Sequence, residues 1–368
     1  MRQALRLAAK AKGRTSPNPM VGAVVVRKGG MVGQGYHRRA GSPHAEVIAL
    51  KKAGTQARGA TLYVTLEPCC HTSKRTPPCV PDICSVGITR VVVAMADPNP
   101  QVRGRGIRQL RQAGIVVDVG CLEHEAKVLN QVYRHWITTG RPFVIVKAGM
   151  TLDGKIATAR GESKWITGEK ARQHVHQLRS QVDAILVGRG TVVKDNPELS
   201  VRTGLRVQRN TQARQPVRVV VDSRLRIPIT SKILRWPLEQ PTIICTTRLA
   251  PKEQIARLRA LQVHVLVLPQ KKGNVSLSAC LSKLGELGMT SVLIEGGSEL
   301  NAAMFQGGWV NQVQLYVAPR LLGGTDALGV IGGSSPQQLS QAFPVTDLTI
   351  HKLGEDFVWI GQCRPNNL

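Results

Sequence analysis

Four residues in the first third of the chain have the types and spacing of a metal-assisted active site. His44 and Glu46 stand two positions apart, and Cys69 and Cys79 follow downstream. One imidazole and two thiolates suit Zn²⁺, whose catalytic sites keep three protein ligands and leave the fourth position for water. A carboxylate beside such a water can carry protons to and from it. These residues therefore predict hydrolytic chemistry, with one zinc ion and with Glu46 as the catalytic acid and base.

The same residues allow two less specific interpretations, a structural zinc site and a histidine that only caps a helix. We prefer the catalytic interpretation because His, Glu, Pro-Cys and Cys occur in the order typical of zinc-dependent nucleobase deaminases. The spacing differs, since nine residues separate Cys69 from Cys79 where nucleic-acid deaminases have two. Cys70, directly after Cys69, is an alternative zinc ligand.

The residues around the cysteines indicate which class of zinc-dependent deaminase the chain resembles. The sequence TLEPC, followed by a loop that ends in RTPPC, resembles the deaminase domain of the bifunctional riboflavin-biosynthesis enzymes. Further matches to that domain are SPNPMVGAVVV (16–26), GYHRRAGSPHAEVIAL (35–50) and DPNPQVRGRGI (97–107). That family usually has eight residues between the two cysteines and a serine at the position of Cys70. We expect Cys69 to be the ligand because it follows Leu66-Glu67-Pro68, as in the family.

The second half lacks a GxGxxG motif, and the fragment at 188–190 is too short to indicate a dinucleotide fold by itself. A glycine-rich turn at 296–297 could bring phosphate to a helix start. The segments VKAGMTLDGKIATARGESKWIT (146–167), AILVGRGTVVKDNPELSVR (184–202), VVVDSRLRIP (219–228), VLIEGGSELNAAMF (292–305) and VAPRLLGG (317–324) resemble the reductase domain of the same family. That domain is similar in fold to dihydrofolate reductase and takes NADPH.

The resemblance implies a set of binding residues in both halves. For the deaminase it implies that Asn18 bonds the pyrimidine and that Lys74 or Arg75 faces the substrate phosphate, although Asn18 before a proline is also a common turn residue. For the reductase it implies substrate contacts at Ser163, Arg179, Leu199, Arg202 and Glu295, and cofactor contacts at Met150, Trp165, Thr191, Asp195, Ser223 and the stretch beginning at Gly297. Arginine forks suit phosphate oxygens, whereas Leu199 would otherwise be a core residue.

Lys147 and Asp153, within or just after an apolar strand, are compatible with proton delivery and equally with a solvated strand end.

The implied function is two successive reactions. Hydrolytic deamination of 2,5-diamino-6-(5-phosphoribosylamino)pyrimidin-4(3H)-one comes first, and NADPH-dependent reduction of the ribosyl group then gives 5-amino-6-(5-phosphoribitylamino)uracil. One rival is a nucleic-acid cytidine or adenosine deaminase that uses the positive charge of the chain to bind phosphates. Another is a fusion in which only the reductase is active. The nucleic-acid deaminase interpretation leaves the second half and the long cysteine loop unexplained.

The elements that must position these residues alternate between strands and helices, which predicts α/β architecture in both halves. We expect a cytidine-deaminase-like α/β/α domain over 1–142 and a dihydrofolate-reductase-like α/β domain over 143–368. In the first, helices are expected at 2–12, 44–54, from about 81, at 104–113 and at 121–140, and strands at 21–27, 31–37, 60–66, 89–95 and 115–119. In the second, strands are expected at 143–150, 184–188, 217–222, 242–246, 263–268, 291–295, 312–318 and 347–360, and helices at 169–181, 251–260 and 276–287.

Length, composition and charge limit the number of domains and the class of protein. With 368 residues the chain is long enough for two domains, and its apolar runs are too short for a membrane span. The formal charge of +27 is spread over both halves, and aromatic residues make up only 4% of the chain, which argues against a nucleic-acid partner and fits a phosphorylated pyrimidine substrate. The clustered cysteines and the absence of a signal peptide predict a cytoplasmic protein. We also expect a homo-oligomer.

Overall fold

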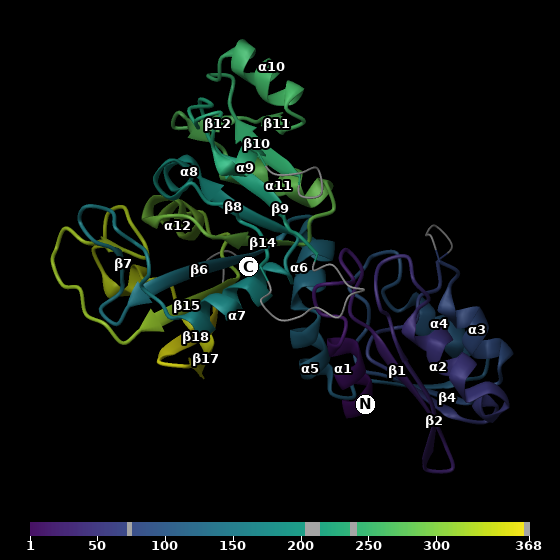
Figure 1. Ribbon diagram of the computed structural model, residues 1–368. Coiled ribbons are helices and arrows are strands. Elements are labelled where there is room, and N and C mark those ends of the chain that lie inside the picture. The colour runs from purple at the N-terminus through teal and green to yellow at the C-terminus, as the bar shows by residue number, and fades with distance from the viewer. Residues whose placement is uncertain (72–75, 203–213, 236–240, 364–368) are drawn as a thin grey trace. The chain divides into compact units, whose positions relative to one another are not determined.

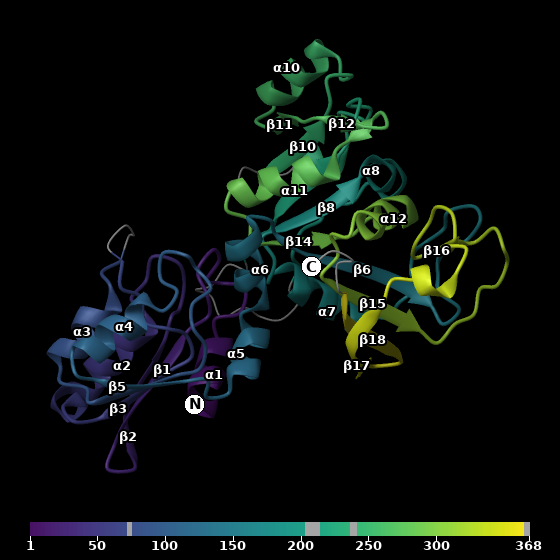
Figure 2. The same cartoon turned by 180° about the vertical axis from the view of Figure 1, so that it is seen from behind.

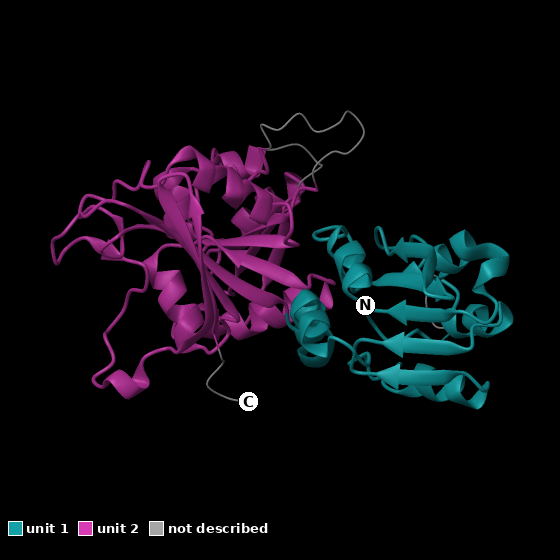
Figure 3. Cartoon of the chain, turned by 90° about the horizontal axis from the view of Figure 1, so that it is seen from below, with its two compact units in different colours: residues 1–141 teal, residues 142–368 magenta. Residues whose placement is uncertain are grey.

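The computed structural model describes residues 1–71, 76–202, 214–235 and 241–363. The chain divides into two compact units, Met1–Arg141 and Pro142–Leu368, which Figure 3 shows in different colours. This division falls one residue before the boundary expected from the sequence. Lys74 and Arg75 lie outside the described residues. Within the described part of the chain, no helix is long and apolar enough to cross a membrane.

The first unit is built on a five-stranded sheet in the order β2-β1-β3-β4-β5 (Figure 1). Its strands are β1 (Gly22–Arg27), β2 (Gly30–Tyr36), β3 (Thr61–Val64), β4 (Arg90–Val93) and β5 (Val116–Val119). β1 pairs antiparallel with β2 and β3, whereas β3, β4 and β5 are parallel. The carboxyl ends of β3 and β4 therefore lie at one edge, where ligands bind in α/β sheets.

Helices cover both faces of this sheet (Figures 1 and 2). They are α1 (Arg2–Ala9), α2 (Ala45–Ala53), η1 (Gly54–Ala57), α3 (Cys79–Ser85), α4 (Arg105–Gln112), α5 (Glu123–Leu129) and α6 (Gln131–Thr139). Side chains alternate along a strand, so Ala23 and Val25 join the core formed with α2, α3 and α4. Val24 and Val26 face the other way, toward Leu7 of α1.

Two glycines let α2 lie directly on β2. A Cβ atom at Gly33 would come 2.2 Å from the carbonyl oxygen of Ala49, and one at Gly35 would come 2.6 Å from that of Ala45. Both distances are below any real Cβ contact, so only glycine allows this approach. Because α2 begins one residue after His44, the packing of α2 on β2 also sets the height of that histidine above the sheet.

The single helix expected over 121–140 is wrong, because the chain breaks at Asn130 into α5 and α6. The side chain of Asn130 accepts a hydrogen bond from the Met20 amide at 2.8 Å and donates one to the Met20 carbonyl at 3.0 Å. This pairing with a distant segment holds Asn130 at φ −102°, ψ 21°, outside the ideal α-helical values. No local sequence pattern reports such a long-range contact.

The second unit contains a nine-stranded sheet in the order β11-β10-β9-β8-β14-β6-β15-β18-β17. The first seven strands in this order are parallel to one another. β18 pairs antiparallel with β15, and β17 pairs antiparallel with β18 at the end of the sheet. Their bounds are β6 (Phe143–Thr151), β8 (Ala184–Gly188), β9 (Val217–Val221), β10 (Thr242–Thr246), β11 (His264–Val267), β14 (Ser291–Ile294), β15 (Gln312–Ala318), β17 (Val345–Leu353) and β18 (Asp356–Cys363). The region expected as strand over 347–360 is thus part of a hairpin that turns near Gly354, which has φ +73°.

The helices of this unit are α7 (Glu169–Arg179), α8 (Arg189–Asp195), α9 (Lys232–Arg235), α10 (Lys252–Ala260), α11 (Leu277–Glu286) and α12 (Ser298–Gln306), with η2 at Leu339–Gln341. Short strands pair outside the main sheet, β7 (Lys155–Ala157) with β16 (Leu328–Gly329) and β12 (Gln270–Lys271) with β13 (Asn274–Val275). The buried core lies between the parallel strands and helices α11 and α12. Helices α8 and α9 and these short strands were not expected from the sequence, whereas α12 begins at the helix start expected after the turn at 296–297.

Candidate active sites

The three expected zinc ligands meet at the carboxyl edge of the first sheet. His44 caps α2, Cys69 follows β3, and Cys79 is the first residue of α3. Nδ1 of His44 lies 3.1 Å from Sγ of Cys79 and 3.4 Å from Sγ of Cys69, and the two sulfurs are 3.5 Å apart. Two helix starts point their positive ends at this cluster, which favours thiolates there.

This donor set fits zinc. Bond lengths of about 2.0–2.3 Å to nitrogen and sulfur in a tetrahedral site imply ligand atoms about 3.5–3.8 Å apart, and the observed separations of 3.1 to 3.5 Å are slightly shorter. Among the described residues, His44, Cys69 and Cys79 form the group that could hold a metal ion, and Cys70 is not part of it. Nε2 of His44 lies 2.9 Å from Oγ1 of Thr76, a contact that orients the ring as a metal-ligand histidine requires.

Glu46 lies beside the cluster with one oxygen unused. Its side chain is buried, and its Oε2 atom has no hydrogen-bond partner among the described residues. Burial, followed by the charge of Cys69, raises the pKa of this carboxyl group. A buried polar atom without a partner is costly to the fold, so its presence next to a metal-ligand cluster points to a reacting group that completes the site.

A cavity of about 550 Å³ opens over these residues, and Asn18 lies in its wall. Nδ2 of Asn18 is 3.1 Å from Nε2 of His37, whose Nδ1 is 3.2 Å from the carbonyl oxygen of Pro43. Asp97 also lines the cavity, and burial raises its pKa to about 6 while Tyr133 donates a hydrogen bond to it. Sequence reasoning missed His37, Asp97 and Tyr133, although His37 and Asp97 fall inside segments that resemble the deaminase family.

A second cavity, of about 650 Å³, lies at the carboxyl ends of the parallel strands of the second unit. Several residues expected from the sequence line it: Ser163, Trp165, Arg179, Thr191, Asp195, Arg202, Glu295 and Gly297. Met150, Leu199 and Ser223 are not among the lining residues. Met150 and Leu199 are buried, and Oγ of Ser223 accepts a hydrogen bond from the Val275 amide at 3.0 Å.

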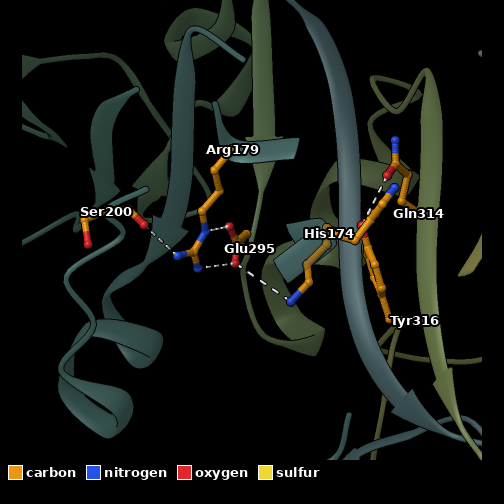
Figure 4. Close-up of polar contacts among 7 residues, drawn as sticks. His174, Arg179, Ser200, Glu295, Gln314 and Tyr316 are labelled. Atoms are coloured by element: carbon orange, nitrogen blue, oxygen red, sulfur yellow. Dashed lines mark hydrogen bonds and ion pairs between the residues drawn. The ribbon is translucent and has the colours of Figure 1, made fainter. Parts of the chain in front are cut away.

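The charged centre of this cavity is the pair Arg179 and Glu295, drawn in Figure 4. Arg179 donates two hydrogen bonds to the Glu295 carboxylate, at 2.6 and 2.9 Å, and a third to the Ser200 carbonyl at 3.1 Å. Nζ of Lys147 lies 3.9 Å from the same carboxylate. Burial alone would raise the pKa of Glu295, but the charges of Arg179 and Lys147 outweigh it and lower the pKa to about 2. Glu295 therefore stays ionised, and burial lowers the pKa of Lys147 despite its attraction to Glu295.

Figure 4 also shows a second polar group, made of His174, Gln314 and Tyr316. The hydroxyl of the buried Tyr316 is 2.8 Å from Nδ1 of His174 and 3.5 Å from Oε1 of Gln314. Nζ of Lys147 lies 5.8 Å from the centroid of the Tyr316 ring. His174 and Tyr316 come from α7 and β15, so this group ties the helix to the sheet under the cavity. Neither residue lies in a sequence pattern that would predict its position beside the cavity.

The cavity also fits a dinucleotide phosphate. Gly297 caps the start of α12, and a Cβ atom at Gly190 or Gly297 would meet nothing within 4 Å. Free N–H groups at a helix start bind phosphate, and the absence of side chains leaves room for it. This is the helix start that the sequence predicted after the turn at 296–297.

Two family models match the chain, one in each unit. The cytidine and deoxycytidylate deaminase zinc-binding region matches residues 1–95, and the RibD C-terminal domain matches residues 142–359. Together with the two folds and cavities, these matches define a bifunctional enzyme, a zinc-dependent deaminase joined to an NADPH-dependent reductase.

Relatives extend over nearly the whole chain. The riboflavin biosynthesis protein RibD of Actinobacillus pleuropneumoniae is 46% identical over 358 residues, which cover 97% of this chain and 93% of that protein. RibD of Escherichia coli is 42% identical over 363 residues, which cover 97% of this chain and 96% of that protein. The structure of Acinetobacter baumannii RibD (form 2) superposes with a TM-score of 0.86 at 38% identity, covering 98% of this chain and 97% of that one. The chain belongs to the RibD family of riboflavin biosynthesis proteins.

A further similar structure belongs to a protein that is named for both activities. The diaminohydroxyphosphoribosylaminopyrimidine deaminase/5-amino-6-(5-phosphoribosylamino)uracil reductase of Thermotoga maritima is 35% identical, with a TM-score of 0.82 and coverage of 99% of this chain and 97% of that one. The expected fold class of both halves is confirmed, and so is the expectation of a riboflavin-pathway deaminase and reductase.

Proposed function

We propose that the first unit deaminates 2,5-diamino-6-(5-phosphoribosylamino)pyrimidin-4(3H)-one, with His44, Cys69 and Cys79 as the residues that hold zinc. When bound, zinc supplies a Lewis acid that lets water attack near neutral pH. Glu46 accepts one proton of the attacking water on Oε2 and passes it to the ring nitrogen. It then carries the second proton, from the hydroxyl left on the attacked carbon, to the departing amine. The carbon–nitrogen bond to the exocyclic 2-amino group breaks, ammonia leaves, and a carbonyl remains.

The observation that carries this proposal is the unused Oε2 atom of Glu46 beside three converging ligand atoms. A structural zinc site needs no such carboxylate, and a helix-capping histidine needs no thiolates. Asn18 and His37, linked at 3.1 Å on the cavity wall, would hydrogen-bond the edge of the pyrimidine.

We propose that the cavity of the second unit then takes the deaminated product and NADPH and yields 5-amino-6-(5-phosphoribitylamino)uracil. When bound, NADPH supplies the hydride that reduces the ribosyl carbon. The open backbone at Gly297 and the start of α12 would hold a cofactor phosphate. Arg202, at the rim with its side chain 69% exposed and paired with Glu198 at 3.6 Å, would meet the substrate phosphate, whereas the two hydrogen bonds to Glu295 hold Arg179 in place. The contacts expected at Met150, Leu199 and Ser223 stay predictions.

Separate measurement of the two products tests this assignment. Purified protein with Zn²⁺, NADPH and the diaminopyrimidine phosphate is expected to release ammonia and to oxidise NADPH. Glu46→Gln, which removes the proton acceptor, should lower ammonia release by at least about 10²-fold, since positioned acid–base catalysis contributes factors of this size. The exposed Glu125→Gln in α5 is the matched control and should retain the full rate. Undiminished ammonia release in Glu46→Gln would contradict the proposed role.

We further propose that the protein is a cytoplasmic homo-oligomer. None of the eight cysteines, all of which lie in the described part of the chain, forms a disulfide, and thiolate ligands persist best in a reducing compartment. β17 is an edge strand with Leu348 and Ile350 exposed, and pairing with a second copy would cover such an edge. Native mass spectrometry of the intact chain measures the oligomeric state, and a purely monomeric spectrum would contradict this part.

A further inference from the structure

A long segment that follows β15 borders the cavity of the second unit. We call residues 319–332 the strap. The strap contains β16, which pairs with β7, and both lie at the same edge of the unit in Figures 1 and 2. Leu328 of the strap lines the cavity together with Ile156 and Ala157 at β7. The strap and β7 therefore form one wall of the space assigned to the reductase substrates.

The far end of the strap is fixed to α12. Nδ2 of Asn301 donates a hydrogen bond to the Val330 carbonyl at 2.9 Å, and the Gly332 amide donates one to the Ser298 carbonyl at 3.1 Å. Ser298 is the first residue of α12, directly after Gly297. The strap thus spans from the end of β15 to the helix start where the cofactor phosphate is proposed to bind.

The strap has little apolar packing of its own. None of its residues is buried, and Leu321 is 74% exposed. Hydrophobic burial is the main source of stability in a fold, so a segment without it depends on its hydrogen bonds. The position of the strap is therefore set by the few residues that bond to its backbone.

Asp153 is the residue that bonds to the near end of the strap. Its carboxylate accepts hydrogen bonds from the Leu322 amide at 3.1 Å and from the Gly323 amide at 2.7 Å. It also accepts one from Oγ1 of Thr151 at 2.6 Å, which fixes the carboxylate at the end of β6. Bonds to an ionised acceptor are about twice as strong as neutral ones, so this carboxylate is a strong anchor.

Neighbouring contacts reinforce the same junction. The Leu152 amide donates to the Arg320 carbonyl at 2.7 Å, and Nζ of Lys155 donates to the Ala327 carbonyl at 3.3 Å. Nη1 of Arg320 donates to the carbonyl of Trp165, a cavity residue, at 3.4 Å. The turn that carries Asp153 is thus linked to the strap on both sides and through it to the cavity wall.

We propose that Asp153 is a positioning residue of the reductase, which holds the strap so that Leu328 and the segment at Trp165 close around the bound reactants. This inference rests on the proposed location of the reductase reaction in this cavity. A role in proton delivery does not fit, because the hydrogen bond from Thr151 and those from the strap lower the pKa of Asp153 to about 2. The carboxylate has no proton to give at neutral pH.

The test compares Asp153→Ala, Asp153→Asn and the control Asp326→Asn, an exposed carboxylate on the strap itself. Asp153→Ala is expected to lower kcat/KM for NADPH oxidation by roughly tenfold or more, because small displacements of positioning groups cost factors of this size. Asp153→Asn keeps one acceptor oxygen and should fall between Asp153→Ala and the native protein. Ammonia release, which uses the other unit, and Asp326→Asn should be unchanged.

Amide hydrogen exchange separates positioning from general damage to the fold. In Asp153→Ala, exchange should become faster in the strap while β6, β15 and the melting temperature stay as in the native protein. Native reductase kinetics in Asp153→Ala would overturn the inference, and so would faster exchange spread over the whole sheet of the second unit. Absence of NADPH oxidation in the native protein would instead reject the proposed function, so the two failures are distinguishable.

Discussion

At the scale of single residues, each cavity contains one carboxylate whose surroundings set its role. Glu46 is buried with an unused oxygen and a raised pKa, as a group that must take up a proton requires. Glu295 is buried in a double hydrogen bond to Arg179 and has a pKa lowered to about 2, so it remains a fixed negative charge. In the proposed function, the same residue type therefore transfers protons in one unit and supplies a fixed charge in the other.

Replacing Glu295 should show how much this charge contributes to the stability of the second unit. Glu295→Gln leaves the Arg179 guanidinium buried without its counter-charge, which should destabilise the unit by about 3–5 kcal/mol. The folded-state pKa of about 2 lies below the ordinary value of 4.5, so the contribution of the ionised pair is fully present above pH 4.5 and is lost as pH falls through about 2. The stability difference between native protein and Glu295→Gln should shrink over this window.

Urea unfolding at a series of pH values measures this difference. Glu286→Gln, which breaks an exposed ion pair with Lys283, is the control and should change stability by less than about 1 kcal/mol. A difference between native protein and Glu295→Gln that is small at neutral pH, or that grows on acidification, would show that the ion pair does not stabilise the unit.

The proposed zinc ligands and Glu46 could be predicted from the sequence because their residue types carry their chemistry, whereas the roles expected for Arg179 and Arg202 came from the resemblance to the family. His37, Tyr133 and His174 could not, since an isolated histidine or tyrosine has many ordinary positions in a fold. Their relation to the cavities depends on contacts across the chain, such as the 2.8 Å approach of His174 to the Tyr316 hydroxyl. Identifying these residues requires the tertiary structure.

At the scale of elements, the zinc site depends on how the turn after β3 is held. The buried Glu67 carboxylate accepts hydrogen bonds from the amides of Asp97 at 3.1 Å, Gly104 at 3.0 Å and Ile107 at 3.2 Å. Gly106 lies so close that a Cβ atom there would be 2.1 Å from the carbonyl oxygen of Pro68, the residue before Cys69. The start of α4 thus presses directly on the backbone that presents a zinc ligand.

Gly106→Ala tests this contact with a substitution that should favour the helix. Alanine favours the helix over glycine by about 1 kcal/mol, but the clash with the Pro68 carbonyl should outweigh this gain. We expect the clash to lower the free energy of unfolding by about 1–3 kcal/mol. Displacement of Cys69 should also weaken zinc binding by roughly 10-fold or more. Thermal unfolding and competition with a chelator measure both effects, with the exposed Gln109→Ala in α4 as control. A more stable Gly106→Ala protein with native zinc affinity would exclude the proposed contact.

The main strands and helices were predictable because their apolar periodicity is strong, as at β8 and β15, where the expected ranges 184–188 and 312–318 coincide with the observed ones. The break at Asn130 and the short strands β7 and β16 were not predictable. The break depends on a side-chain contact with Met20, and the short strands depend on pairing between segments about 170 residues apart. These elements are fixed by tertiary contacts and carry no local pattern of their own.

At the scale of the whole molecule, the two cavities are lined by residues of one unit each. Removal of zinc should therefore stop one reaction and spare the other. After treatment with a chelator, ammonia release should be lost, whereas NADPH oxidation with the deaminated product should continue at the native rate and ammonia release should return on adding Zn²⁺. Loss of both activities together would mean that the zinc site also supports the reductase unit.

The proposed deamination depends on a zinc ion held by His44, Cys69 and Cys79 with one coordination position left for a reacting molecule. X-ray absorption spectroscopy of the zinc-loaded protein measures the ligands directly. We predict two sulfur atoms at about 2.3 Å and two lighter atoms at about 2.0–2.1 Å, only one of them from a histidine. The spectrum should be unchanged in Cys70→Ser and should lose one sulfur in Cys69→Ser. Three sulfurs, or a second histidine in place of the open position, would contradict the proposed active site.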